Sequence, residues 1–345
     1  MKTLVAGWFS FEQGHATAGD LLAAELACDW LENAGQSYDI AVDPPFTGGI
    51  NWRLADPKNY SQIVFVCGPF LAKGTLETEF LTHFAGCRLI GLDLTMLESL
   101  DKSNPFDVLL ERDSSIRVNP DITFISPRKL VPVVGVCLVE PYEQGLTDIT
   151  NTAIRRLVAS REVAVVDIDT RLDTNTTGLR TPAEVESLLA RMDLVITTRL
   201  HGTVLSLKNG VPTISIDPEA GGAKIKRQMQ KIGWSVMFTV DELTDEKLQK
   251  AFDYCLTQEA RTKAKECCDR SQKMLEEVRN EFIRASVESG KPELELVRIN
   301  SENLKYQSFR RIEVDPNYQI YSEKSYRRVV KDNVKQLLKS LVRFQ

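Results

Sequence analysis

Residues 193–234 read DLVITTRLHGTVLSLKNGVPTISIDPEAGGAKIKRQMQKIGW, and this stretch decides the fold. Its first apolar run, 194–196, is too short for a helix and rich in β-branched residues, which predicts a buried strand. Residues 203–208 suit a helix that Asn209-Gly210 ends, and 211–216 predict a second strand. A further helix follows and closes at Gly233. The alternation of strand, loop and helix predicts a parallel α/β unit.

Polar residues follow both predicted strands of this unit. Arg199 and His201 come after the first strand, and Gly221, Gly222 and Lys224 come after the second. Open parallel sheets bind ligands at the carboxyl ends of their strands. A lone arginine or histidine is more often structural, but this chain has three histidines in total and one lies two residues from an arginine. The pattern therefore indicates a functional site at this edge.

The order of motifs resembles the carboxy-terminal half of the polysaccharide pyruvyl transferase family. These motifs are an apolar strand headed by an aspartate, then Arg-x-His, Gly-Val-Pro and Asp-Pro. In this chain they stand at Asp193, Arg199-Leu200-His201, Gly210-Val211-Pro212 and Asp217-Pro218. The resemblance implies a GT-B-like fold, in which two Rossmann-like parallel-sheet domains face each other across a cleft. It also implies transfer of a pyruvyl group from phosphoenolpyruvate to sugar hydroxyls, which forms a cyclic ketal.

That chemistry suggests roles for particular side chains. His201 is the expected general acid, since imidazole can donate a proton near neutral pH. Arg199 and Arg112 would bind the phosphate and carboxylate of the donor, because a guanidinium can grip either bidentately. Asp20 would take the acceptor proton. Backbone N–H groups at Gly221 and Gly222, with Lys224 beside them, would bind an anion at a helix start. The scheme needs no metal and no cofactor other than the donor substrate.

Two of these residues lie in the first half of the chain, where simpler roles compete. The family typically carries a Gly-Asp pair at the start of a helix, which Gly19-Asp20 matches, but Asp20 could equally be the N-cap of a helix over 21–31. Arg112-Asp113 matches an Arg-Asp pair of the family, but could be an exposed ion pair. The chain also departs from the family. Many members carry an arginine after the strand at 133–138, where this sequence has Val139-Glu140-Pro141.

Two other functions remain open from the sequence. A GT-B glycosyltransferase would bind a nucleotide diphosphate at the Gly-Gly-x-Lys helix start, with Arg199 neutralising it. A non-catalytic family member would bind glycans, and the arginine absent near Glu140 favours this slightly. Ligand-induced stabilisation by phosphoenolpyruvate, by nucleotide sugars or by neither would separate the three.

Composition bounds the organisation of the chain. Its 345 residues exceed one ordinary core, so we expect domains at 1–127 and 128–290 and an extension at 291–345. A net charge of −5 argues against nucleic acid as a partner. No apolar run is long enough for a membrane helix. The seven cysteines are expected to be core residues of a reducing compartment, and the amino terminus is expected to be a strand and not a signal peptide. These features predict a cytoplasmic protein.

The extension differs in charge from the rest of the chain. Between 300 and 345 it carries ten Lys and Arg against five Asp and Glu, and its apolar residues at 329–342 share one face of a predicted helix. Such a helix most often packs on its own protein or on a second subunit of a homo-oligomer. The alternative is peripheral contact with the anionic inner face of a membrane. The acceptor is expected to be a glycan or a lipid-linked sugar.

Overall fold

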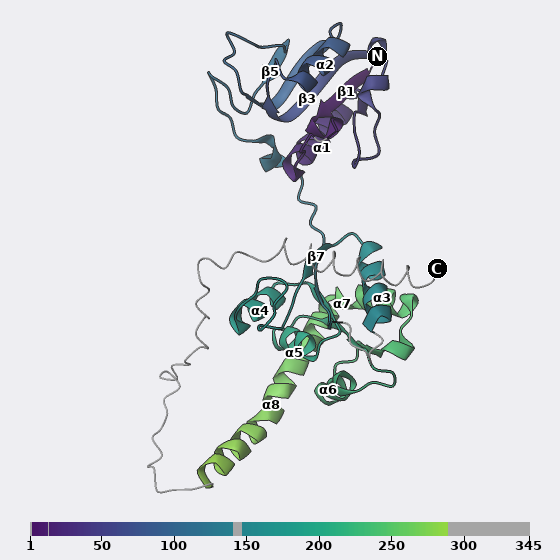
Figure 1. The fold of residues 1–345 in the computed structure, drawn as a ribbon, viewed down its shortest axis with the longest axis vertical. Helices are drawn as coiled ribbons and strands as arrows, with labels where there is room; N and C mark the ends of the chain where they lie inside the picture. The colour runs from purple at the N-terminus through teal and green to yellow at the C-terminus, as the bar shows by residue number, and fades with distance from the viewer. Residues whose placement is uncertain (1, 13, 141–146, 289–345) are drawn as a thin grey trace, which may run out of the picture. The chain divides into compact units, whose positions relative to one another are not determined.

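The computed structural model describes residues 2–12, 14–140 and 147–288 (Figure 1). Its contacts divide the chain into two compact units, Met1–Lys129 and Leu130–Gln345. Each unit is built around its own sheet and is described by itself. The helical extension expected at 291–345 lies outside the described residues.

Unit 1 is organised around a sheet of five parallel strands in the order β2-β1-β3-β4-β5. The strands are β1 (Lys2–Gly7), β2 (Tyr38–Ile40), β3 (Tyr60–Phe70), β4 (Arg88–Met96) and β5 (Val108–Leu110). The helices are α1 (Ala18–Asn33) and α2 (Thr75–His83). Short 3-10 turns are η1 (Trp8–Ser10), η2 (Trp52–Leu54), η3 (Pro57–Asn59) and η4 (Ile122–Ile125).

The two faces of this sheet bury different side chains, because successive residues of a strand point to opposite sides. One face packs Val5, Val64 and Val66 against the small residues Ala23 and Ala27 of α1. The opposite face carries an aromatic cluster in which neighbouring rings meet edge to face or at a tilt: Phe11, Trp52, Phe65, Phe70, Phe80 and Phe84. Both faces are therefore covered, as a parallel sheet requires.

Unit 2 repeats this architecture with the strand order β10-β9-β8-β6-β7, again parallel throughout. The strands are β6 (Val133–Cys137), β7 (Ala164–Asp167), β8 (Leu194–Thr197), β9 (Thr213–Asp217) and β10 (Met237–Thr239). The helices are α3 (Thr147–Ala159), α4 (Pro182–Leu189), α5 (Leu200–Lys208), α6 (Lys224–Ile232), α7 (Asp245–Cys255) and α8 (Gln258–Glu288), and η5 (Val240–Glu242) is a 3-10 turn.

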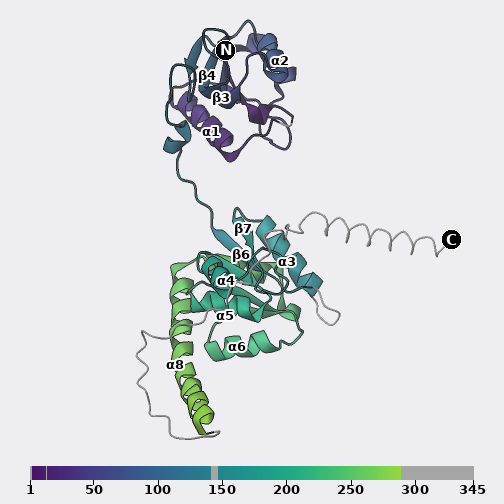
Figure 2. The same ribbon diagram turned by 60° about the vertical axis from the view of Figure 1, so that its left-hand side comes forward.

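Helix α8 begins against its own unit and then leaves it. Ala260, Ala264 and Cys267 are fully buried in the unit 2 core. Further along, Val278 and Phe282 are 57% and 70% exposed. Figure 2 shows this second half of α8 extending beyond the sheet of its unit. Within the described residues, no helix combines the length and apolar character that a membrane span would need.

The expected fold class of two α/β units with parallel sheets is confirmed, with local corrections. Thr181 caps α4 in a capping box with Glu184. The expected N-cap role of Asp20 is wrong. Helix α1 begins at Ala18 with Thr17 as its N-cap, and Asp20 is the third helical residue. The helix therefore begins three residues before the predicted start at 21. The reason is the capping box Thr17-x-x-Asp20, in which the Asp20 carboxylate accepts from the Thr17 backbone N–H.

Candidate functional site

Each sheet has one point where its strand order reverses, and such points are where open parallel sheets bind ligands. In unit 2 this point lies between β6 and β8, because β7 lies on one side of β6 and β8 on the other. The loop after β6 carries Glu140, and the loop after β8 carries Arg199. The predicted Arg-x-His motif therefore stands at the switch point of its sheet.

Hydrogen bonds between the two loops hold this switch point together. The Val139 backbone N–H donates to the Thr198 hydroxyl at 2.8 Å. The Thr197 hydroxyl donates to the Cys137 carbonyl at 2.7 Å and accepts from the Arg199 backbone N–H at 3.0 Å. Both threonines are buried, so these bonds form away from water. The backbone that presents Arg199 is thereby fixed to β6.

The Arg199 guanidinium is mostly buried and already holds several partners. Its side chain is 13% exposed, and Nε donates to the Leu138 carbonyl at 2.8 Å. Nη2 lies 2.6 Å from Glu140 Oε2 and 3.5 Å from Asp169 Oδ1. Asp169 follows β7 and is itself buried. Arg199 is thus aimed into the switch point by groups from the ends of β6 and β7.

His201 lies on the first turn of α5, beside Arg199 and exposed to solvent. The sequence placed it in the loop before a helix at 203, but the helix begins at Leu200. Among the described residues, its ring has no hydrogen-bond partner. Gly202 lets the helix approach β8 closely, since a Cβ there would stand 2.4 Å from Thr197 Oγ1 and 3.1 Å from Cys137 Sγ. The imidazole is therefore free to meet a ligand at the sheet edge.

The Gly-Gly-x-Lys segment is placed differently from the Arg-x-His motif. Gly221 and Lys224 are exposed, and α6 begins at Lys224. The carboxylate of Asp217, at the end of β9, accepts from the backbone N–H groups of Ala223 at 2.7 Å, and of Ile225 and Lys226 at 3.2 Å. The Gly221 N–H donates to Asp241 at 2.9 Å. A buried carboxylate thus occupies the helix start that the sequence offered to an anion.

In unit 1 the switch point lies between β1 and β3. Asp20 is buried, and its Oδ2 accepts from the Thr17 N–H and hydroxyl, both at 2.7 Å. Its Oδ1 faces Gly68 at the end of β3, where a Cβ would come within 3.3 Å of it. The positive φ of 84° at Gly68 suits glycine. The predicted Asp20 therefore stands at the switch point, with one oxygen committed to the capping box.

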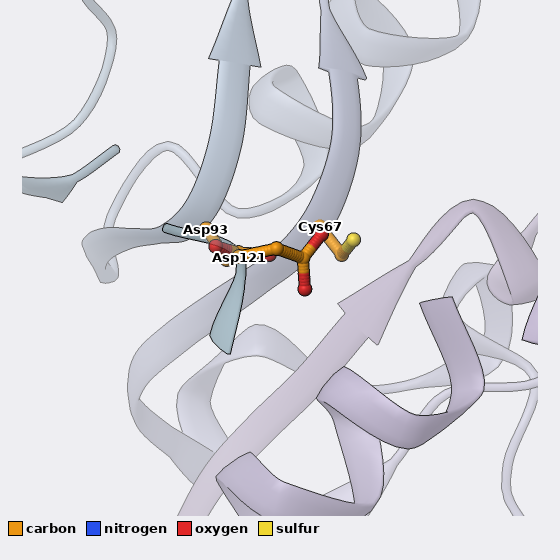
Figure 3. Close-up of side chains that lie close together, drawn as sticks. All are labelled: Cys67, Asp93 and Asp121. Carbon is orange, nitrogen blue, oxygen red and sulfur yellow. The ribbon is translucent and has the colours of Figure 1, made fainter. Parts of the chain in front are cut away.

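Arg112 lies in a cluster with three groups that sequence reasoning missed. Its Nη1 is 2.7 Å from Asp121 Oδ2, 3.7 Å from Asp93 Oδ2 and 3.6 Å from Cys67 Sγ. Nη2 donates to the Thr95 hydroxyl at 3.0 Å. Figure 3 shows Cys67, Asp93 and Asp121 close together. The Cys67 sulfur and one carboxylate oxygen of each aspartate lie within 4.8 Å of one another. The guanidinium stands among these atoms, so the positive charge there comes from Arg112.

The backbone of this cluster is strained at two neighbouring positions. Cys67 and Asp93 have φ values of 59° and 57°, and they lie side by side where the β3–β4 register passes from Val66↔Leu92 to Gly68↔Leu94. Such strain costs about 1–3 kcal/mol at each residue and tends to cluster at functional sites. Burial raises the pKa of the Cys67 thiol to about 12, so it is a thiol and not a nucleophilic thiolate. Burial also raises the pKa of Asp93.

The structure brings together only some of the predicted residues. Arg199 and His201 share the unit 2 switch point, whereas Gly221, Gly222 and Lys224 follow β9 on the far side of β8. Asp20 and Arg112 both lie around Cys67 in unit 1, whose thiol pKa is influenced by both of their charges. The acidic partners Glu140, Asp169, Asp93 and Asp121 were not predicted. For Glu140, Asp169 and Asp93 the signal in the sequence is a carboxylate shortly after, or within, the end of a strand, whereas Asp121 precedes the turn η4.

Residues 106–219 match the sequence model of the family described as Polysaccharide pyruvyl transferase. The resemblance that the motifs indicated is therefore confirmed over this range. Arg112, Arg199 and His201 lie inside it, whereas Asp20 and the segment 221–224 lie outside. No curated protein matches the chain.

Several solved structures have a similar arrangement at low identity. The UDP-GlcNAc 2-epimerase from Methanocaldococcus jannaschii is 11% identical, with 75% of this chain and 94% of that chain covered and a TM-score of 0.30. E. coli ADP-heptose lps heptosyltransferase II is 11% identical, with 75% of this chain and 99% of that chain covered and a TM-score of 0.26. The glycosyltransferase SnogD from Streptomyces nogalater is 14% identical, with 78% of this chain and 95% of that chain covered and a TM-score of 0.25.

Proposed function

We propose that this protein transfers a pyruvyl group from phosphoenolpyruvate to two hydroxyls of a sugar, forming a ketal on a cell-surface glycan or its precursor. The observation that carries the proposal is the position of Arg199 and His201. Both stand at the switch point of the unit 2 sheet, within the range that matches the pyruvyl transferase family. One is a buried cation and the other an exposed imidazole, which together suit an anionic donor that must be protonated.

The reaction can be balanced with these groups. His201 donates a proton to the methylene carbon of the enol, which becomes the methyl group. The first acceptor hydroxyl bonds to the central carbon and loses its proton to a base. The C–O bond to phosphate then breaks, and the second hydroxyl bonds to the same carbon as its proton leaves with the phosphate. The family resemblance gives Asp20 as the base, which stays a prediction from the sequence; its Oδ1 is the oxygen outside the capping box.

A nucleotide-sugar reaction is disfavoured by the environment of Asp217. A glycosyltransferase using the Gly-Gly-x-Lys helix start would need its backbone N–H groups for a diphosphate. Three N–H groups of this turn donate to the Asp217 carboxylate instead. A diphosphate there would have to displace a buried carboxylate of the same sign.

A donor panel tests the proposal directly. The full chain is incubated with phosphoenolpyruvate and candidate glycan or lipid-linked acceptors, and released phosphate and ketal product are measured. Thermal unfolding is followed in parallel with phosphoenolpyruvate and with nucleotide sugars. Stabilisation by phosphoenolpyruvate with ketal formation supports the proposal. Stabilisation by nucleotide sugars alone would point to glycosyl transfer, and stabilisation by neither to a non-catalytic protein.

Replacement of Arg199 by lysine is expected to weaken phosphoenolpyruvate binding about tenfold, although the charge is kept. Lysine has no planar fork and cannot donate to the Leu138 carbonyl while also gripping an anion. Titration calorimetry of wild type and Arg199→Lys measures the change. The matched control is Arg155→Lys, since Arg155 forms an exposed ion pair with Asp167. Equal affinities of wild type and Arg199→Lys would assign Arg199 a structural role only.

We further propose that the extension serves attachment and not chemistry, in a cytoplasmic enzyme. Truncation after Gly290 keeps all described elements. We expect donor binding within about twofold of wild type, because no predicted site residue lies beyond 290. If the extension joins subunits, the truncated protein should sediment as a smaller assembly than the lost mass explains. If it contacts a membrane, vesicles with anionic lipids should bind the full chain but not the truncated protein, and this binding should weaken as salt rises. Loss of donor binding by the folded truncated protein would mean that the extension completes the site.

A further inference from the structure

A second arginine, Arg171, reaches the unit 2 switch point through Glu140. It lies in the loop after β7, and its Nη1 is 3.7 Å from Glu140 Oε1. The other oxygen of the same carboxylate, Oε2, lies 2.6 Å from Arg199 Nη2. Glu140 therefore bridges two guanidinium groups that come from the ends of different strands. A carboxylate or phosphate group of a ligand would make the same bridge.

The loop that carries Arg171 is held in place without Glu140. Asp169 Oδ1 accepts from the Arg171 backbone N–H at 2.9 Å, and Oδ2 accepts from the Thr176 N–H at 3.1 Å. The Asn175 amide donates to the Asp169 carbonyl at 2.9 Å. Asp169 also faces the Arg199 guanidinium at 3.5 Å, so one buried carboxylate holds that guanidinium and the backbone of Arg171. The Arg171 guanidinium is held by Asp173, which accepts from Nε at 3.1 Å and from Nη2 at 2.7 Å and leaves Nη1 toward Glu140. Both guanidinium groups would keep their positions if Glu140 moved away.

Glu140 is the most exposed of the three side chains Glu140, Arg199 and Asp169. Its side chain is 47% exposed, whereas those of Arg199 and Asp169 are 13% and 6% exposed. Among the described residues, Arg199 Nη1 has no hydrogen-bond partner, so a bidentate ligand could use Nη1 together with the Nη2 that Glu140 now occupies. A carboxylate ligand that replaced Glu140 would leave the net charge of the cluster unchanged.

We propose that Arg171 and Arg199 form an oxyanion site for a carboxylate or phosphate monoester, and that Glu140 occupies this site until the ligand displaces it. Where the ligand is phosphoenolpyruvate, the inference rests on the proposed function and adds Arg171 and Glu140 to it. Glu140 then acts as an internal competitor that lowers the affinity of the site for every anion. Neutralising the Glu140 side chain should therefore tighten anion binding, whereas loss of a ligand-binding residue would weaken it.

The test measures the affinities of phosphoenolpyruvate, pyruvate and inorganic phosphate by titration calorimetry at fixed salt. Glu140→Gln is expected to bind its preferred anion about tenfold more tightly than wild type, because a neutral amide competes less for an arginine. Arg171→Gln is expected to bind it about fivefold more weakly. The matched controls are Glu186→Gln, whose partner is Lys208, and Arg155→Gln, whose partner is Asp167. Both controls should bind as wild type does.

The three anions distinguish the source of the chemistry. Tightening for pyruvate identifies a carboxylate subsite, and tightening for inorganic phosphate identifies a phosphate subsite. An unchanged or weakened affinity in Glu140→Gln, or an affinity in Arg171→Gln equal to wild type, overturns the proposal. So does equal tightening in Glu186→Gln, which would reduce the effect to overall charge. Unfolding curves of each variant establish that the protein titrated is folded.

Failure of this inference and failure of the proposed function give different results. Ketal formation from phosphoenolpyruvate with no tightening in Glu140→Gln would uphold the reaction and reject the internal competitor. Tightening for an anion without ketal formation would uphold the oxyanion site and reject the reaction.

Discussion

His201→Asn is expected to lose about 10²–10⁴-fold in the rate of ketal formation, the usual effect of removing a general acid. The methylene carbon of phosphoenolpyruvate must gain a proton before an acceptor hydroxyl can bond to the neighbouring central carbon. His201 is exposed on the first turn of α5, two residues from Arg199. Asparagine keeps a polar side chain of similar size at this position but carries no proton that it can transfer. Donor affinity should remain near that of wild type, because the guanidinium groups are unchanged.

The measurement is phosphate release and ketal formation at saturating donor, with donor affinity measured separately. His83→Gln is the matched control, because His83 lies in unit 1 with its Nε2 2.9 Å from the Ala55 carbonyl. Glutamine can still donate to that carbonyl, so the control should turn over normally. If His201→Asn turned over as fast as wild type, another group would have to protonate the enol carbon. If both rate and donor affinity fell together, His201 would act in binding.

The sequence predicted the architecture well where patterns are local. The apolar runs at 194–196 and 211–216 appear as β8 and β9. The predicted helix boundaries were wrong where polar residues belong to the helix. The motif Arg-Leu-His looked like a loop, but α5 begins at Leu200 because Gly202 allows the helix to approach β8.

The site was only partly visible because ion pairs join residues far apart in sequence. Arg199 is stabilised by Glu140 and Asp169, which follow two other strands. A carboxylate after a strand does not show which arginine it will meet, and only the strand order brings these partners to one edge. Arg171 was missed for the same reason, since it lies in a loop whose form depends on the buried Asp169. The anion site expected at Gly221, Gly222 and Lys224 depended on backbone N–H groups, and the sequence did not reveal that Asp217 takes them.

Asp217 supports the start of α6 from the end of β9. It is 1% exposed, and its Oδ2 accepts three backbone N–H groups, at 2.7 Å, 3.2 Å and 3.2 Å. A helix leaves its first N–H groups without partners inside the helix, so a side chain or a ligand must satisfy them. A negative charge at this end also interacts favourably with the helix dipole. Asp217 therefore stabilises the fold at the place where a nucleotide diphosphate would otherwise bind.

Asp217→Ala is expected to lower the free energy of unfolding by about 3 kcal/mol, because it leaves buried N–H groups unpaired and removes a charged acceptor. Asp217→Asn, whose side-chain oxygen can still accept, should lose about 1 kcal/mol. Chemical denaturation measures both values, and Asp241→Ala is an exposed control that removes the acceptor of the Gly221 N–H. Phosphoenolpyruvate affinity should stay near wild type in every folded variant, because Arg199 and Arg171 lie in loops that follow other strands. If Asp217→Ala instead gained affinity for nucleotide diphosphates and lost little stability, the helix start would be a ligand site and the glycosyltransferase alternative would be favoured.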